Sequence, residues 1–323
     1  MSEPDWAFPA ELRPRPEQWR FDLDHALASL VLVRAEIPED AYTAQILGTE
    51  RAGNGVVIRD DGLVLTIGYL ITEASSVWLT TGRGAVLAAH PLAYDQQTGF
   101  GLLLPLGKLD APALPRGSAA AAQVGDDVVV AGHGGRAHAL QAKLFDKREF
   151  AGYWEYVLDE ALFAEPAHPQ WGGSALIGAD GRLLGIGSLL VEEKAGARNV
   201  QGNMFVPVDL LEPILEDLVT RGRARRPARP WLGMYTTEIG EKLVVAGLAN
   251  GGPAERAGLK LGDAVVEVSE QRVRGLAELF RSVWRLGPAG VEVPLTLSRA
   301  GARMNVRLKS ADRNDFLKKP SVH

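Results

Sequence analysis

The sequence predicts a mostly β protein in which a β-barrel or β-sandwich domain precedes a smaller α+β domain. Three observations point to this architecture. Between residues 43 and 206, short apolar runs are broken repeatedly by glycine, which is typical of many short strands. Residues 207–219 carry apolar side chains at helical spacing and close the β region. A stretch rich in arginine and proline then separates a second compact pattern.

Composition limits the classes of function. The chain has 323 residues, 46% apolar and 23% charged, as expected of a globular protein of two domains. The net charge of -5 gives no general attraction to nucleic acid, and the lack of cysteine rules out disulfides and thiol catalysis. No window approaches the ~18 uninterrupted apolar residues of a membrane span. We predict no cofactor, metal, nucleic-acid or membrane site.

The N-terminus lacks the basic and apolar regions of a secretory signal. We therefore expect a cytoplasmic protein, or a periplasmic one if the native start differs from Met1.

Domain boundaries follow changes in composition. Residues 1–15 are proline-rich and acidic, which indicates a loose tail or a wrapping arm, and Pro16 favours a helix start. Five arginines and two prolines between residues 220 and 230 are typical of an exposed linker. We predict an arm and helix at 1–27, a first domain at 28–219, a linker at 220–230, a second domain at 231–311 and a tail at 312–323.

The second domain is expected to contain strands, one helix and a final pair of strands. The helix is predicted over residues 275–286, where apolar residues recur three and four apart. Two extended segments follow, at 291–298 and 303–308.

Three segments of the first domain resemble the catalytic segments of trypsin-like serine proteases of the HtrA/Deg family. Residues 53–71 (GNGVVIRDDGLVLTIGYLI) match the segment that carries the family's histidine. Residues 95–103 (DQQTGFGLL) match the aspartate segment, and residues 165–177 (EPAHPQWGGSALI) the serine segment. The resemblance implies a trypsin-like double β-barrel. It also implies a homo-oligomer, a trimer built through this domain.

The three catalytic residue types are missing at the matching positions. The histidine falls on Tyr69, the aspartate on Gly99 and the serine on Gly172. A serine hydroxyl needs a base, the base needs an orienting partner, and a tyrosine with a pKa near ~10 is a poor base at neutral pH. We therefore expect that all three triad positions are lost, that the chain is a pseudoprotease and that it is not an enzyme.

The oxyanion hole is altered as well. In the family, its donors are the N–H of the serine and the N–H of a glycine two residues earlier, which falls on Gln170. A side chain at Gln170 restricts the backbone of that turn. An alternative stays open, in which Ser174 and His168 form a rearranged serine protease site.

Residues 231–311 resemble the PDZ domain that follows the protease domain in HtrA/Deg proteins. The start, Trp231-Leu232-Gly233-Met234, matches the carboxylate-binding loop of that domain. A second motif, GPAERAGLKLGD at residues 252–263, is the most specific match in the chain.

The PDZ resemblance implies that an extended peptide adds to a strand edge, beside a helix. Successive N–H groups of Leu232, Gly233 and Met234 would capture a terminal carboxylate. Three residues on one face of the predicted helix, Leu276, Phe280 and Val283, would floor the pocket for the last peptide side chain. The alternatives are that these side chains fill the core, and that the domain binds its own first domain instead of a ligand.

These observations favour a peptide- or protein-binding adaptor or regulator that acts on C-termini through its PDZ groove. Two alternatives remain open: an active serine endopeptidase with a rearranged site, and a chaperone-like holder of unfolded proteins.

Overall fold

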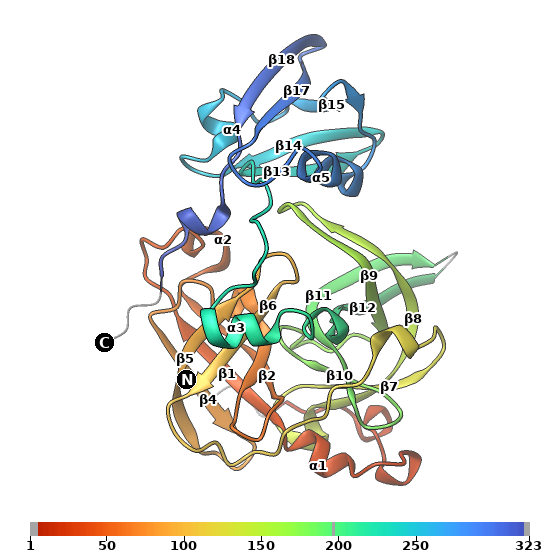
Figure 1. Ribbon diagram of the computed structural model, residues 1–323. Helices are drawn as coiled ribbons and strands as arrows, with labels where there is room; N and C mark the ends of the chain where they lie inside the picture. Colours follow the sequence, from red (N-terminus) through yellow and green to blue (C-terminus); the bar gives the residue numbers. More distant parts are fainter. Residues whose placement is uncertain (1–5, 196–197, 320–323) are drawn as a thin grey trace. The chain divides into compact units, whose positions relative to one another are not determined.

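The computed structural model describes residues 6–195 and 198–319 (Figure 1). It forms two compact units. The first holds the chain up to residue 148, residues 160–224 and the end from residue 318, and the second holds residues 149–159 and 225–317. The ends of the predicted arm and tail, at 1–5 and 320–323, lie outside the described residues.

Two closed barrels build the first unit. The first barrel runs in the order β1-β2-β3-β6-β5-β4 and the second in the order β10-β11-β12-β9-β8-β7. The strands of the first barrel are β1 (Leu30–Glu36), β2 (Glu50–Val57), β3 (Val64–Ile67), β4 (Ser76–Thr81), β5 (Val86–Tyr94) and β6 (Phe100–Pro105). The strands of the second are β7 (Asp127–Ala131), β8 (Ala139–Gly152), β9 (Tyr156–Glu165), β10 (Ala175–Ile177), β11 (Leu183–Ala195) and β12 (Arg198–Pro207).

The glycine-broken apolar runs form these strands because both barrels bury their interiors. All four residues of β3 are buried, and Leu65 pairs with Leu102 of β6. Gly55 of β2 lies where a Cβ atom would stand 2.6 Å from Val64, so the strands approach closely at this position.

The helices of the first unit are short: α1 (Leu23–Leu27), α2 (Ala44–Leu47) and α3 (Leu215–Arg221). Pro16–Gln18 is only a 3-10 turn, and the helix predicted at 207–219 is a 3-10 turn at Val208–Leu210 followed by α3. Pro213 lies between the two and has no N–H to continue a helix. Phe8, which belongs to the predicted arm, is 8% exposed and packs in the core of the second barrel.

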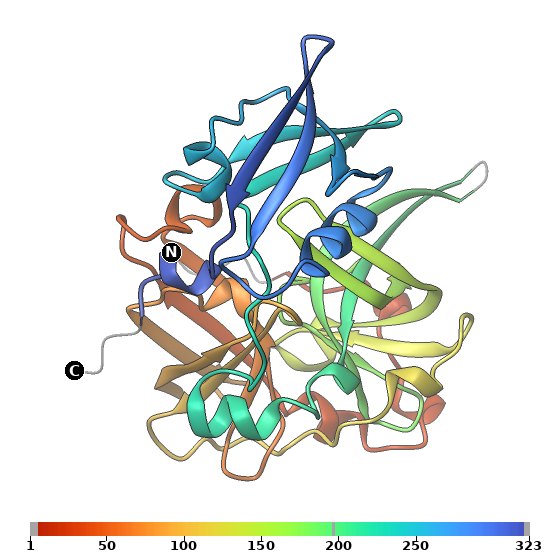
Figure 2. The same cartoon turned by 45° about the horizontal axis from the view of Figure 1, so that its top comes forward.

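The second unit contains a sheet in the order β13-β14-β15-β17-β18, with β16 paired to β15. The long hairpin of β17 and β18 is dark blue in Figure 2. The elements are β13 (Met234–Ile239), β14 (Lys242–Leu248), α4 (Pro253–Arg256), β15 (Ala264–Val268), β16 (Gln271–Arg272), α5 (Leu276–Trp284), β17 (Glu292–Arg299) and β18 (Ala302–Lys309).

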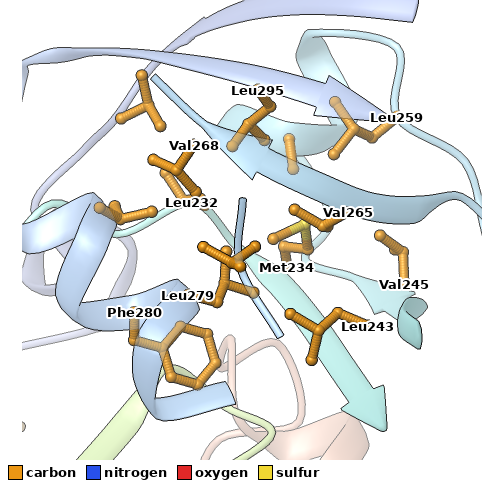
Figure 3. Close-up of a cluster of buried hydrophobic side chains, with 14 of the residues drawn as sticks. Leu232, Met234, Leu243, Val245, Leu259, Val265, Val268, Leu279, Phe280 and Leu295 are labelled. Atoms are coloured by element: carbon orange, nitrogen blue, oxygen red, sulfur yellow. The ribbon is translucent and has the colours of Figure 1, made fainter. Parts of the chain in front are cut away.

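An apolar core joins α5 to this sheet (Figure 3). Leu279 and Phe280 of the helix lie in one cluster with Leu232 of the preceding loop and Met234 of β13. Residues 149–159, the tip of the hairpin formed by β8 and β9, contribute to the same core through Val157, which is 7% exposed. The predicted first domain, 28–219, included residues 149–159, which the structure groups with the second unit. Sequence reasoning could not place them there, because their partners lie more than 70 positions away along the chain.

Candidate functional site

Tyr69 and Gly172 meet at the matched position of the trypsin-like unit. Tyr69 follows β3 in the 3-10 turn Gly68–Leu70, and its hydroxyl donates a hydrogen bond of 2.9 Å to the carbonyl oxygen of Ser188. A Cβ atom on Gly172 would stand 2.9 Å from that hydroxyl oxygen. Burial raises the pKa of Tyr69 far above its usual value, so the hydroxyl remains a donor.

Gly99 lies in the turn that supports Tyr69. Its N–H donates to the carbonyl oxygen of Asp95 at 2.8 Å, and its own carbonyl accepts from the N–H of Gly68 at 2.7 Å. The φ of Gly99 is +83°, a left-handed conformation that suits glycine. The structure therefore brings together the three predicted positions Tyr69, Gly99 and Gly172, and none of them supplies a nucleophile or a carboxylate.

The N–H of Gln170, the predicted upstream oxyanion donor, is engaged by His168. It donates to Nδ1 of His168 at 3.1 Å, which leaves the proton on Nε2 to be donated to the carbonyl oxygen of His138 at 3.0 Å. Burial lowers the pKa of His168 to about 4, so this ring is neutral near pH 7. His168 thus orders the loop through both ring nitrogens.

Ser174 is fully buried, and its hydroxyl donates to the carbonyl oxygen of Trp171 at 2.9 Å. Its backbone carbonyl accepts from the N–H of Gly187 at 2.8 Å. Because both nitrogens of His168 bond backbone groups, the alternative pair Ser174 and His168 makes no base–nucleophile hydrogen bond in this conformation.

Asn54, which the sequence reasoning missed, holds the same loop. Its side-chain amide donates to the carbonyl oxygen of Gln170 at 2.9 Å, and its backbone N–H donates to that of Gly172 at 2.8 Å. Its side-chain oxygen accepts from the N–H of His133 at 2.8 Å. The only sequence signal was a polar residue between two glycines in an otherwise apolar strand.

The loop between Trp231 and Met234 holds a carboxylate. The N–H groups of Leu232, Gly233 and Met234 all donate to Oε1 of Glu155, at 3.1, 2.8 and 3.1 Å, and Leu232 also reaches Oε2 at 2.9 Å. Gly233 has a φ of +69°, which turns its N–H toward the others. Glu155 had no signal in the sequence analysis.

The other predicted peptide-binding residues have structural contacts. Phe280 and Val283 are each 1% exposed in the core, as in the alternative that they fill it, and Leu276 is half-buried against that core. Trp231 is 5% exposed, exchanges two backbone hydrogen bonds with Ala311 and packs on Phe316 with ring centroids 4.8 Å apart.

Comparisons with known proteins agree with this architecture. Residues 53–186 match the family described as "Trypsin-like peptidase domain", and residues 230–309 match "PDZ domain". The prediction of a mostly β chain with a trypsin-like double barrel and a C-terminal PDZ domain is confirmed. The chain carries a trypsin-like peptidase domain followed by one PDZ domain.

Its relatives are HtrA- and Deg-type proteases. One, named "Probable periplasmic serine endoprotease DegP-like", from Halomonas elongata, is 26% identical over 82% of this chain and 57% of its own length. "Serine endoprotease DegS" from Haemophilus influenzae is 22% identical over 80% of this chain and 77% of its own. The solved structure "HtrA-type protease AlgW with tripeptide" shares the fold, with a TM-score of 0.53, 19% identity and coverage of 93% and 99% of the two chains.

Two expectations are corrected by these findings. The expectation that the chain is not an enzyme is contradicted, because its relatives are named serine endoproteases. It was drawn from side chains at three positions, whereas the similarity extends over most of the chain. The expectation of a cytoplasmic protein is contradicted by the periplasmic relatives. Within residues 6–195 and 198–319, no helix is long and apolar enough to cross a bilayer.

Proposed function

We propose that the PDZ domain of this chain binds the C-termini of polypeptides through the loop at Leu232, Gly233 and Met234. One observation carries the proposal: three successive N–H groups of the loop already converge on a single carboxylate oxygen. A terminal carboxylate offers the same acceptor, and charge-assisted hydrogen bonds of this kind are roughly twice as strong as neutral ones.

The test is a titration of the full chain with a labelled peptide that ends in an apolar residue and a free carboxylate. The amidated peptide should bind at least about tenfold more weakly, since it lacks the charged acceptor. Gly233→Ala should abolish binding of the free peptide, because it strains the left-handed turn and its Cβ would stand 3.0 Å from that of Ala249. Gly240→Ala is the matched control, since Gly240 has a φ of +60° and nothing within 4 Å. Equal affinity for the two peptides would contradict the proposal.

Serine endopeptidase activity is the second candidate, and the names of the relatives favour it. Those relatives also favour a periplasmic location, which we propose for this chain. The Halomonas protein is longer, and this chain spans 57% of it. Because Gly172 has no hydroxyl, Ser174 is the serine of this loop that remains for the reaction. It would have to leave its hydrogen bond to Trp171 and gain a base.

Casein hydrolysis and fluorophosphonate labelling test this candidate. Activity that is lost in Ser174→Ala but kept in the exposed control Ser75→Ala would support it. Hydrolysis that survives Ser174→Ala would place the nucleophile elsewhere, and no hydrolysis by the full chain would exclude the candidate.

A further inference from the structure

The hairpin tip at residues 153–157 lies on the PDZ domain as a bound peptide would. The carboxylate of Glu155 occupies the loop, and the carbonyl oxygen of Tyr153, two residues earlier, accepts from the N–H of Thr236 at 3.2 Å. Thr236 belongs to β13, the edge strand of the sheet. A carboxylate on the loop combined with backbone bonding to the edge is how an extended peptide adds to such a sheet.

Side chains of the hairpin add further contacts that resemble those of a bound peptide. Val157 is 7% exposed and joins the apolar cluster that includes Phe280 and Val283. Arg281 of α5 pairs with both Glu149 and Asp159, which flank the tip on its two strands. Within the second unit, the tip therefore supplies a carboxylate, a backbone acceptor and an apolar side chain to residues 225–317.

The position of Glu155 is energetically unfavourable for a glutamate. It is 7% exposed and has a φ of +61°, which a non-glycine residue seldom adopts. Burial raises the pKa of Glu155 to about 7, although the three loop N–H groups and the nearby charge of Arg313 act in the opposite direction. An apolar side chain would pack here without that desolvation cost, so core packing alone does not account for a glutamate.

We propose that Glu155 is an internal ligand of the PDZ loop, which competes with the C-terminal carboxylate of a polypeptide for the same N–H groups. This inference rests on the proposed function. A tethered ligand acts at a high effective concentration, and the apparent affinity for an external ligand falls by the fraction of domains left open. A peptide therefore binds the N–H groups of the PDZ loop only when Glu155 has left them.

The experiment compares three forms of the chain: wild type, Glu155→Ala and the control Glu160→Gln. The control removes an exposed carboxylate from β9, the strand that follows Glu155. The probe is a fluorescent peptide with an apolar, free C-terminus, and the amidated peptide is measured in parallel. Glu155→Ala should bind the free peptide at least about tenfold more tightly than wild type. Glu160→Gln should match wild type, and the amidated peptide should bind weakly to all three.

The possible results separate this inference from the proposed function. Equal affinity of wild type and Glu155→Ala for the free peptide overturns the internal ligand and leaves the proposed function standing. Equal binding of free and amidated peptides by Glu155→Ala overturns the proposed function and the competition together. If Glu155→Ala does not fold, as judged by circular dichroism, Glu155→Gln replaces it. This variant keeps the shape and removes the charge, and a gain in affinity smaller than about twofold overturns the inference.

Discussion

The hydroxyl oxygen of Tyr69 lies 2.9 Å from the position that a Cβ atom on Gly172 would take, and it is anchored there by the carbonyl of Ser188. A side chain at position 172 and the hydroxyl of Tyr69 therefore exclude each other.

Gly172→Ser should lower the free energy of unfolding by about 1–3 kcal/mol, the usual cost of overpacking. The loss should be smaller in a Tyr69→Phe background, because removing the hydroxyl opens the space. Urea unfolding of the two single variants and the double variant measures the coupling. Gly82→Ser is the control, since Gly82 has nothing within 4 Å. Strictly additive losses would contradict the contact.

His168 should make stability depend on pH. Its pKa is about 4 in the folded chain and 6.5 as the ordinary value, so between these values the unfolded chain binds the extra proton. The free energy of unfolding should therefore fall as the pH drops from 6.5 to 4, by up to about 3 kcal/mol. His168→Gln should flatten this slope, and His25→Gln, on the exposed side of α1, should keep it. The measurement is urea unfolding at several pH values between 6.5 and 4. If His168→Gln leaves the pH dependence of the unfolding free energy unchanged, the ring is not buried and neutral.

Asp263 should contribute to the stability of the second unit. It is 1% exposed and accepts two hydrogen bonds of 2.7 Å from Arg299. These hydrogen bonds hold the pKa of Asp263 below its usual value. The stabilisation is present above the ordinary pKa of 3.8 and is lost on further acidification. Asp263→Asn should cost about 2–4 kcal/mol in thermal or urea unfolding. Glu292→Gln, which breaks an exposed pair with Arg307, should cost less than about 1 kcal/mol. Equal costs would contradict the assignment.

Peptide binding should strengthen as the pH falls through the pKa of Glu155, which is about 7. Because its pKa is raised, Glu155 takes up a proton and becomes neutral over this range. A peptide carboxylate with a pKa of about 3.5 stays ionised. The nearby positive charge of Arg313 favours the ionised form of Glu155. Fluorescence anisotropy at about pH 8 and about pH 5.5 should show tighter binding at the lower pH in wild type. The dependence should be absent in Glu155→Ala, and the same dependence in both chains would point to another group.

Local patterns in the sequence predicted a β-rich first domain and a smaller second domain, and the family resemblance predicted their folds. The motif at residues 252–263 resembles the PDZ motif, and its hydrogen bonds include local ones, such as that from the N–H of Lys260 to Asp263. The three triad matches likewise placed Tyr69 beside Gly172. The partners of the loops could not be predicted. Glu155 and Leu232 are 77 positions apart, and Asn54 and Gln170 are 116 apart, so no local spacing joins them.

Amide hydrogen exchange of the full chain tests the internal ligand most directly. The measurement follows the N–H groups of Leu232, Gly233 and Met234 in wild type, in Glu155→Ala and in Glu155→Ala with the free peptide. Hydrogen bonds to Glu155 should protect these amides in wild type. Exchange should accelerate in Glu155→Ala and slow again when the peptide carboxylate takes the place of Glu155. Equal exchange in wild type and Glu155→Ala would contradict the claim that this carboxylate occupies the loop.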